Sequence, residues 1–128
     1  MREIKFRGKT GTVKGDIWAY GYLYKVKSLL DDNYQYYIRN EHLQDVIVNE
    51  KTIGQFTGIY DKNNVPIYEG DIVKSLINTF KIVYKKGCFF AVGINRRQEY
   101  TLFEEINMCE KANIKLEVIG NIYDKETN

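Results

Sequence analysis

The chain has 128 residues, 44% of them hydrophobic and 14% aromatic, with 11 tyrosines and a formal net charge of +2. This length suits one domain, or one small barrel with an additional arm, and excludes a large two-lobed enzyme. No apolar run is long enough to cross a bilayer, so we expect a soluble, cytoplasmic protein without a membrane partner.

The first half of the chain contains several short segments with the pattern of β-strands. Residues 18 to 25 alternate large aromatic side chains with small or polar ones, and residues 34 to 38 and 46 to 48 are short aromatic or β-branched runs. The Asp-Asp-Asn sequence at 31 to 33 favours a turn, because these side chains bond their own downstream backbone. Together they predict a hairpin over about residues 22 to 38.

The central segment, residues 52 to 74, has explicit turn chemistry. The Asp-Lys-Asn-Asn sequence at 61 to 64 predicts a turn. Pro66 lacks an N–H, which places residues 65 to 68 at a sheet edge or in an extended crossing. The Glu-Gly-Asp sequence at 69 to 71 then predicts a reversal before a β-branched strand.

The last part of the chain predicts a second hairpin. Residues 80 to 84 and 88 to 94 are strand-like and flank Lys-Lys-Gly, whose glycine supplies the positive φ of a tight reversal. Residues 102 to 109 have apolar side chains near helical spacing, which predicts one short helix. Residues 114 to 119 alternate again and predict a final strand.

The two cysteines, Cys88 and Cys109, are far apart and belong to no Cys-x-x-Cys pair. We therefore expect small buried hydrophobic side chains, without a disulfide framework or a zinc site.

Three ordered blocks of the sequence resemble the YopX family. The central one reads Gly-Gln-Phe-Thr-Gly at 54 to 58 and Tyr-Glu-Gly-Asp-Ile-Val at 68 to 73, and flanking blocks at 2 to 23 and 117 to 123 are similar to the ends of the family pattern. Asn64 stands where the family usually has Gly, and Asn also adopts left-handed backbone. The signature positions that we interpret as structural are Gly54, Gln55, Thr57, Gly58, Tyr68, Glu69, Gly70, Asp71, Gly120 and Asn121.

The resemblance implies an all-β fold with at most one short helix. It implies an SH3-like small β-barrel over residues 51 to 128, preceded by a mostly β arm or meander over residues 1 to 50, or one continuous globular unit of both. It also implies phage or prophage origin. It implies no reaction, because the family has no established activity and small barrels serve many functions.

Two surfaces are candidates for binding. Residues 74 to 97 contain six basic side chains and no carboxylate, and a basic hairpin at residues 81 to 97 could meet phosphates. It could also dock on an acidic surface such as residues 98 to 128 of the same or a neighbouring subunit, although a solvated hairpin is the favoured interpretation. Alternating tyrosines in the first strand could stack bases, although a half-buried sheet surface or an oligomer contact is the favoured interpretation. The candidate binding residues are Lys85, Lys86, Arg96, Arg97, Tyr20, Tyr22 and Tyr24.

Catalytic chemistry is not indicated. His42, the single histidine, fits a surface loop beside Glu41, and no metal site, cofactor site or His-based triad can be assembled. The first hypothesis is a non-enzymatic phage accessory module that associates with a protein partner or with itself as a homo-oligomer. The alternatives are a nucleic-acid-binding barrel and an unrecognised enzyme.

Overall fold

The computed structural model describes residues 3–11, 17–76, 78–94, 100–108 and 115–124, and for residues 100–104 it describes the backbone alone. In this part of the chain there are eleven β-strands and one turn of 3-10 helix, η1 (Glu50–Thr52), which confirms the predicted all-β class. The strands are β1 (Phe6–Lys9), β2 (Trp18–Lys27), β3 (Tyr34–Arg39), β4 (Asp45–Val48), β5 (Gly54–Tyr60), β6 (Pro66–Tyr68), β7 (Asp71–Ser75), β8 (Asn78–Lys85), β9 (Cys88–Ile94), β10 (Tyr100–Asn107) and β11 (Glu117–Asn121).

The chain divides into two compact units, Met1–Phe56 (unit 1) and Thr57–Asn128 (unit 2). Hydrogen-bonded neighbours follow the order β4-β3-β2-β1-β5-β6 in one sheet and β10-β9-β8-β7-β11 in the other. Strand β5 begins in unit 1, where Gln55 is opposite Phe6, and it ends in unit 2. Strand β6 is the last strand of its sheet, as the proline predicts.

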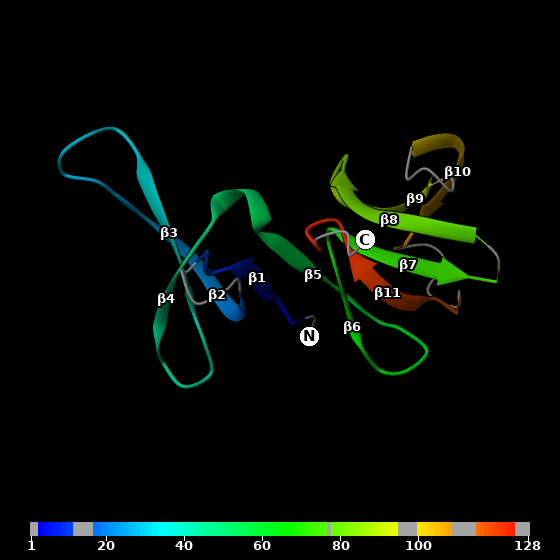
Figure 1. The fold of residues 1–128 in the computed structure, drawn as a ribbon, viewed down its shortest axis with the longest axis horizontal. Helices are drawn as coiled ribbons and strands as arrows, with labels where there is room; N and C mark the ends of the chain where they lie inside the picture. The colour runs from blue at the N-terminus through cyan, green and yellow to red at the C-terminus, as the bar shows by residue number, and fades with distance from the viewer. Residues whose placement is uncertain (1–2, 12–16, 77, 95–99, 109–114, 125–128) are drawn as a thin grey trace. The chain divides into compact units, whose positions relative to one another are not determined.

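Strands β2 and β3 of unit 1 form the predicted hairpin, with Tyr22 opposite Arg39 and Lys27 opposite Tyr34. The turn is closed by a bond from the N–H of Ser28 to the carbonyl of Asn33 at 2.8 Å, and the carboxylate of Asp31 accepts the N–H of Asn33. Figure 1 shows this hairpin as a long arm in which β2 is blue and β3 is cyan. Residues 28–33 are called the arm tip below.

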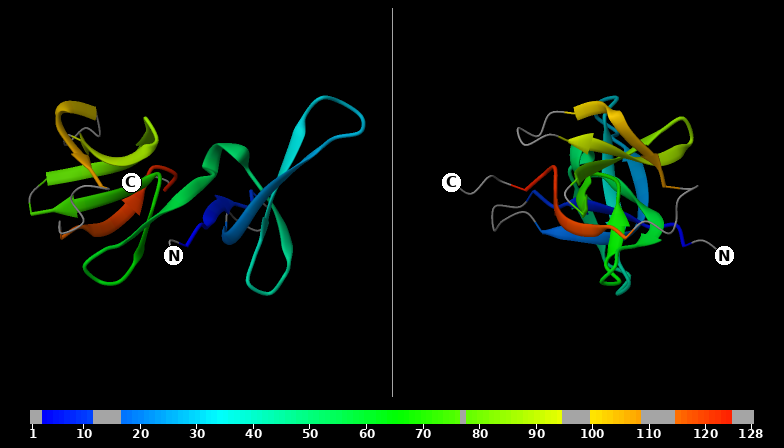
Figure 2. Two further views of the ribbon diagram at one scale, coloured as in Figure 1. Left: turned by 180° about the vertical axis from the view of Figure 1, so that it is seen from behind. Right: turned by 90° about the vertical axis from the view of Figure 1, so that its right-hand side faces the viewer.

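Unit 2 is built on an antiparallel sheet whose last strand, β11, returns to pair with its first, β7. Figure 2 shows these strands curling around one another. The SH3-like barrel that the resemblance implies is not closed among the described residues, because the hydrogen-bonded order stays open at β10 and β11. A curled open sheet can still enclose a core on its concave face.

The β8–β9 hairpin is confirmed. Lys85 is opposite Cys88, and the two connecting residues, Lys86 and Gly87, have φ values of 52° and 76°. Two successive positive φ values fit the right-handed twist of the flanking strands.

The helix predicted over residues 102 to 109 is wrong, because this segment is strand β10. Ile106 is opposite Ala91, and Asn107 is opposite Phe90, so β10 extends the sheet along β9. A register shift between Tyr100 and Glu105 interrupts the two-residue alternation. The bulge therefore produces apolar spacing that resembles a helix.

The two units differ in how much they bury. A core cluster of Ile67, Val73, Phe80, Ile82, Phe89, Ala91, Met108 and Leu116 fills unit 2. In the described part of unit 1, the buried hydrophobic side chains are Ile38, Val48 and Phe56.

Cys88 is disulfide-bonded, so the expectation of an unpaired buried cysteine is wrong for this residue. Distance along the sequence does not limit how closely two cysteines approach in a fold. Cys109 lies outside the described residues.

Candidate functional site

The residues of the central signature make contacts that shape the backbone. Thr57 is buried, and its hydroxyl donates to the carbonyl of Ile67 at 2.8 Å and accepts the N–H of Ile59. Gly58 and Gly70 have φ values of 85° and 91°, which favour glycine. These contacts hold the chain bends between β5, β6 and β7.

Two aspartates complete this framework. Asp71 is 2% exposed, and its carboxylate accepts the N–H of Tyr68, itself buried, across the bend that contains Glu69. Asp61 is 6% exposed and accepts the N–H groups of Asn63, Val65 and, from β11, Val118. Burial alone would raise the pKa of Asp61, but the three backbone donors together outweigh it and hold the pKa below its usual value.

Gly54, Gln55, Gly120 and Asn121 also lie in strands. Gly54 is opposite Arg7 in β1, and Asn121 is opposite Asp71 in β7. The side-chain oxygen of Asn121 accepts the N–H of Tyr123 at 2.8 Å and shapes the turn after β11. None of these contacts provides a reactive group.

The basic hairpin is partly neutralised. The ammonium of Lys85 lies 2.8 Å from a carboxylate oxygen of Glu105 and 5.1 Å from the ring centre of Phe90. Lys86 is exposed at the turn. Arg96 and Arg97 lie outside the described residues.

The three tyrosines of β2 share one face of the unit 1 sheet, as the alternation predicts. Tyr20, Tyr22 and Tyr24 are 44%, 71% and 37% exposed. Tyr24 stacks on Tyr37 of β3 with ring centres 5.2 Å apart, which leaves the first two tyrosines as the more open pair.

Charged side chains on this face are bound within the sheet. Arg39 holds Asp45 through two hydrogen bonds, of 2.8 and 3.0 Å. The guanidinium keeps the pKa of Asp45 below its usual value. Arg7, 5% exposed, lies 4.3 Å from the ring centre of Trp18, where Lys9 also lies at 5.3 Å. These cations contact an acidic or aromatic side chain of the sheet, so they contribute to the aromatic surface more than to binding an anionic ligand.

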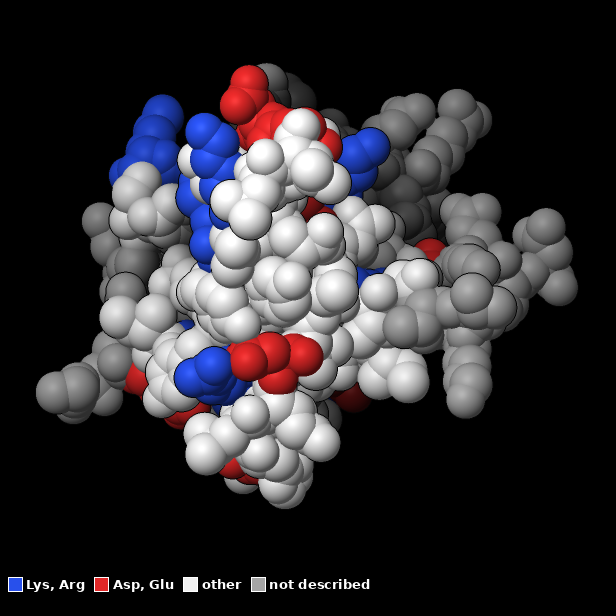
Figure 3. Space-filling view, turned by 90° about the vertical axis from the view of Figure 1, so that its left-hand side faces the viewer, with Lys and Arg blue, Asp and Glu red and all other residues white. Residues whose placement is uncertain are grey.

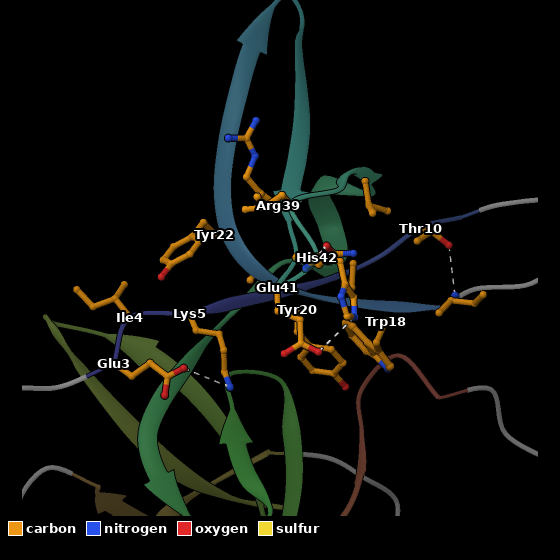
Figure 4. A pocket seen from close by; sticks show the side chains of 16 residues that line it. Glu3, Ile4, Lys5, Thr10, Trp18, Tyr20, Tyr22, Arg39, Glu41 and His42 are labelled. Carbon is orange, nitrogen blue, oxygen red and sulfur yellow. Dashed lines mark hydrogen bonds and ion pairs between the residues drawn. The ribbon is translucent and has the colours of Figure 1, made fainter.

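A cavity of about 810 Å³ opens beside these aromatic residues, entirely within unit 1. We call it the unit 1 groove. Figure 4 shows the side chains that line it, from the N-terminal segment, β2 and the β3–β4 turn. Its lining residues are Glu3, Ile4, Lys5, Thr10, Ile17, Trp18, Ala19, Tyr20, Gly21, Tyr22, Arg39, Asn40, Glu41, His42, Leu43 and Val46.

His42 lies at the exposed rim of the groove in the β3–β4 turn, as the sequence predicts. The turn is held by the side-chain oxygen of Asn40, which accepts the N–H groups of His42 and Gln44. The imidazole lies 3.5 Å from the carboxylate of Glu41. In the part of the chain that the structure describes, no group of three or more His, Cys, Asp or Glu side chains could hold a metal ion.

The arm tip was not predicted from the sequence. Leu29 and Leu30 are 102% and 96% exposed. Two adjacent leucines beside a predicted Asp-Asp-Asn turn were the available signal, because turn residues are usually polar. Figure 3 faces the side on which β3 and β4 lie, and uncharged side chains occupy most of its middle.

Among the described residues, no helix is long and apolar enough to span a membrane.

Comparison with known proteins adds a family. The model of the YopX protein family matches residues 5–127, which is nearly the whole chain. A search of curated proteins found no significant match.

Proposed function

The chain belongs to the YopX family, and from that premise we propose that it is a cytoplasmic accessory protein of a phage or prophage that acts by associating with itself, not by catalysis. The observation that supports self-association is the concentration of exposed apolar side chains on the β2–β3 arm and its surroundings. These are Tyr20, Tyr22, Tyr24, Val26, Leu29, Leu30 and Tyr34.

Exposure of this kind is unfavourable in an isolated chain. Single apolar side chains are common on protein surfaces, but contiguous apolar patches on soluble proteins mark interaction sites. Tyrosine is enriched in such contacts, because its ring buries area while its hydroxyl keeps a polar partner. Covering an aromatic ring such as that of Tyr22 would contribute about 1 to 2 kcal/mol.

Sedimentation equilibrium of the purified protein over a wide concentration range tests the proposal. We expect a reversible oligomer that dissociates on dilution and is weakened by Tyr20→Ser with Tyr22→Ser. The matched control replaces Tyr60 and Tyr84, each 50% exposed in unit 2, by Ser. A strict monomer at the highest concentration would overturn the proposal.

Nucleic acid is a second candidate, favoured by the six basic side chains and absent carboxylates of residues 74 to 97. Phosphate binding predicts retention on DNA or RNA that falls steeply with salt. Joint replacement of Arg96 and Arg97 by Ala should weaken it. No retention at low salt would remove this candidate.

A further inference from the structure

This inference rests on the proposed self-association and specifies its geometry. We propose that two copies exchange arms: the tip of one copy, carrying Leu29 and Leu30, enters the unit 1 groove of a second copy, and the second copy's tip enters the first groove.

The arm tip is an ordered projection that carries two adjacent apolar side chains. Besides the bond between Ser28 and Asn33, the hydroxyl of Ser28 accepts the N–H of Leu30 at 3.2 Å. The turn is therefore organised by its own hydrogen bonds, yet it presents both leucines fully to solvent. A rigid exposed knob loses little conformational entropy when it is bound.

The groove matches this knob in size and polarity. Its volume of about 810 Å³ falls within the range of roughly 300 to 1,000 Å³ that is usual for binding sites. Ile17, Tyr22 and Leu43 on its lining are 63%, 71% and 79% exposed. An apolar occupant would cover these side chains.

The ion pairs of the groove argue against an anionic ligand. Lys5 lies 3.7 Å from Glu3, and Arg39 is held by two hydrogen bonds to Asp45. A phosphate would have to displace a carboxylate from either cation. Leu29 and Leu30 need no such displacement, and the carboxylates of the tip are already engaged within the arm: Asp31 accepts the N–H of Asn33, and Asp32 lies 3.7 Å from the ammonium of Lys27.

The tip cannot reach the groove of its own chain. Tyr22 and Leu29 are separated by seven residues along a continuous ladder that runs from the Tyr22–Arg39 pair to the Lys27–Tyr34 pair. A strand rises about 3.3 Å per residue, so the two sites are roughly 20 Å apart on a stiff element. The occupant must come from another molecule.

The area needed for a stable contact favours a reciprocal exchange over a single insertion. A buried leucine removes roughly 100 Å² from water and an aromatic ring about 150 to 250 Å². One tip in one groove therefore buries only about 500 Å², well below the roughly 1,200 Å² of stable interfaces. Two insertions around a two-fold axis bring the total close to that value.

Sedimentation of a tip variant is the first test. Leu29→Ser with Leu30→Ser should raise the dimer dissociation constant at least about tenfold. The control is Leu76→Ser, an 89% exposed leucine in a turn of unit 2. If the wild type self-associates and the tip variant does so equally well, arm exchange is wrong while the proposed self-association stands. A wild type that is monomeric overturns both.

Mixing two defective variants is the decisive test. The tip variant retains its groove, and Tyr20→Ser with Tyr22→Ser retains its tip. Because a single contact buries less than half of a stable interface, arm exchange predicts that each variant alone is largely monomeric and that their mixture forms heterodimers with one intact contact at protein concentrations well above the wild-type dissociation constant. Native mass spectrometry at those concentrations, with one partner isotope-labelled, detects them. If heterodimers are no more abundant than either homodimer, arm exchange is wrong. Circular dichroism of the β-sheet signal checks that both variants are folded.

Discussion

At the scale of single residues, Asp61 connects parts of unit 2 that are remote in sequence. One carboxylate oxygen accepts the N–H groups of Asn63 and Val65 within its own turn, and the other accepts that of Val118 in β11. Lys62 adds a backbone bond to Leu116. The Asp-Lys-Asn turn therefore fixes both its own shape and the position of the last strand.

Two substitutions of Asp61 should destabilise the protein to different degrees. Asp61→Ala leaves three N–H groups without this acceptor and should lower the free energy of unfolding by about 2 to 4 kcal/mol. Asp61→Asn keeps one acceptor oxygen but turns a donor toward Val118. Its loss in free energy of unfolding should therefore be smaller than that of Asp61→Ala but still measurable. Urea denaturation measures both, with Asp32→Ala at the exposed arm tip as the control. Equal midpoints for Asp61→Ala and Asp32→Ala would contradict the role of this carboxylate.

The pH dependence of stability should report the same contacts. Because the pKa of Asp61 in the folded protein is below its ordinary value of 3.8, the ionised carboxylate stabilises the fold at pH values above that ordinary value. This contribution is lost as pH falls through the lower folded pKa. The stability difference between wild type and Asp61→Asn should therefore be largest near neutrality and shrink in acid. Urea midpoints of both proteins from neutral pH to about pH 3 check it, and a difference that grew in acid would contradict the sign.

Local turn chemistry could be predicted from sequence because it depends on neighbouring residues. Asn64 indeed has a positive φ of 63°, and Asp31 indeed caps the arm turn. The bond from Val118 to Asp61 spans 57 positions, and no local pattern encodes it. The groove escaped prediction for the same reason, because it joins the N-terminal segment to β2 and the β3–β4 turn.

At the scale of elements, strand alternation predicted the two hairpins and the tyrosine face, since the side-chain period of a strand is two. It failed at β10, where the register shift between Tyr100 and Glu105 breaks that period. Similarly, the family resemblance predicted the β class of unit 2 but not how far its sheet closes. Closure depends on long-range pairing of edge strands, which local patterns do not specify.

Two glycines with positive φ should respond very differently to alanine. A Cβ at Gly21 in β2 would lie 2.0 Å from the backbone oxygen of Arg39, whereas a Cβ at Gly87 would meet nothing within 4 Å. Gly87→Ala should therefore lose only about 1 to 2 kcal/mol from backbone strain. Gly21→Ala should separate β2 from β3 and lose several kcal/mol or unfold unit 1. Denaturant unfolding with amide NMR spectra checks this, and equal effects of the two substitutions would refute the close approach.

At the scale of the whole molecule, the two units differ in the balance of buried and exposed apolar surface. Unit 2 contains the core cluster around Val73, Ile82 and Ala91, all fully buried. The described part of unit 1 buries few hydrophobic side chains and exposes many on its arm. A small core contributes little stability by itself, so unit 1 has the stronger physical reason to gain stability from association.

Hydrogen exchange should reveal this difference as a dependence on protein concentration. At high dilution, amides of β2 and β3 should exchange faster than those of β8 and β9, because opening unit 1 exposes less apolar surface. If association covers the arm, protection of β2 and β3 should rise with concentration. Linkage adds about 1.4 kcal/mol, or roughly tenfold slower exchange, at a concentration ten times the dissociation constant. The amides of β8 and β9 are the internal control, since their core is complete within unit 2. Protection of β2 and β3 that already equals that of β8 and β9 in the monomer would show that unit 1 is stable without a partner.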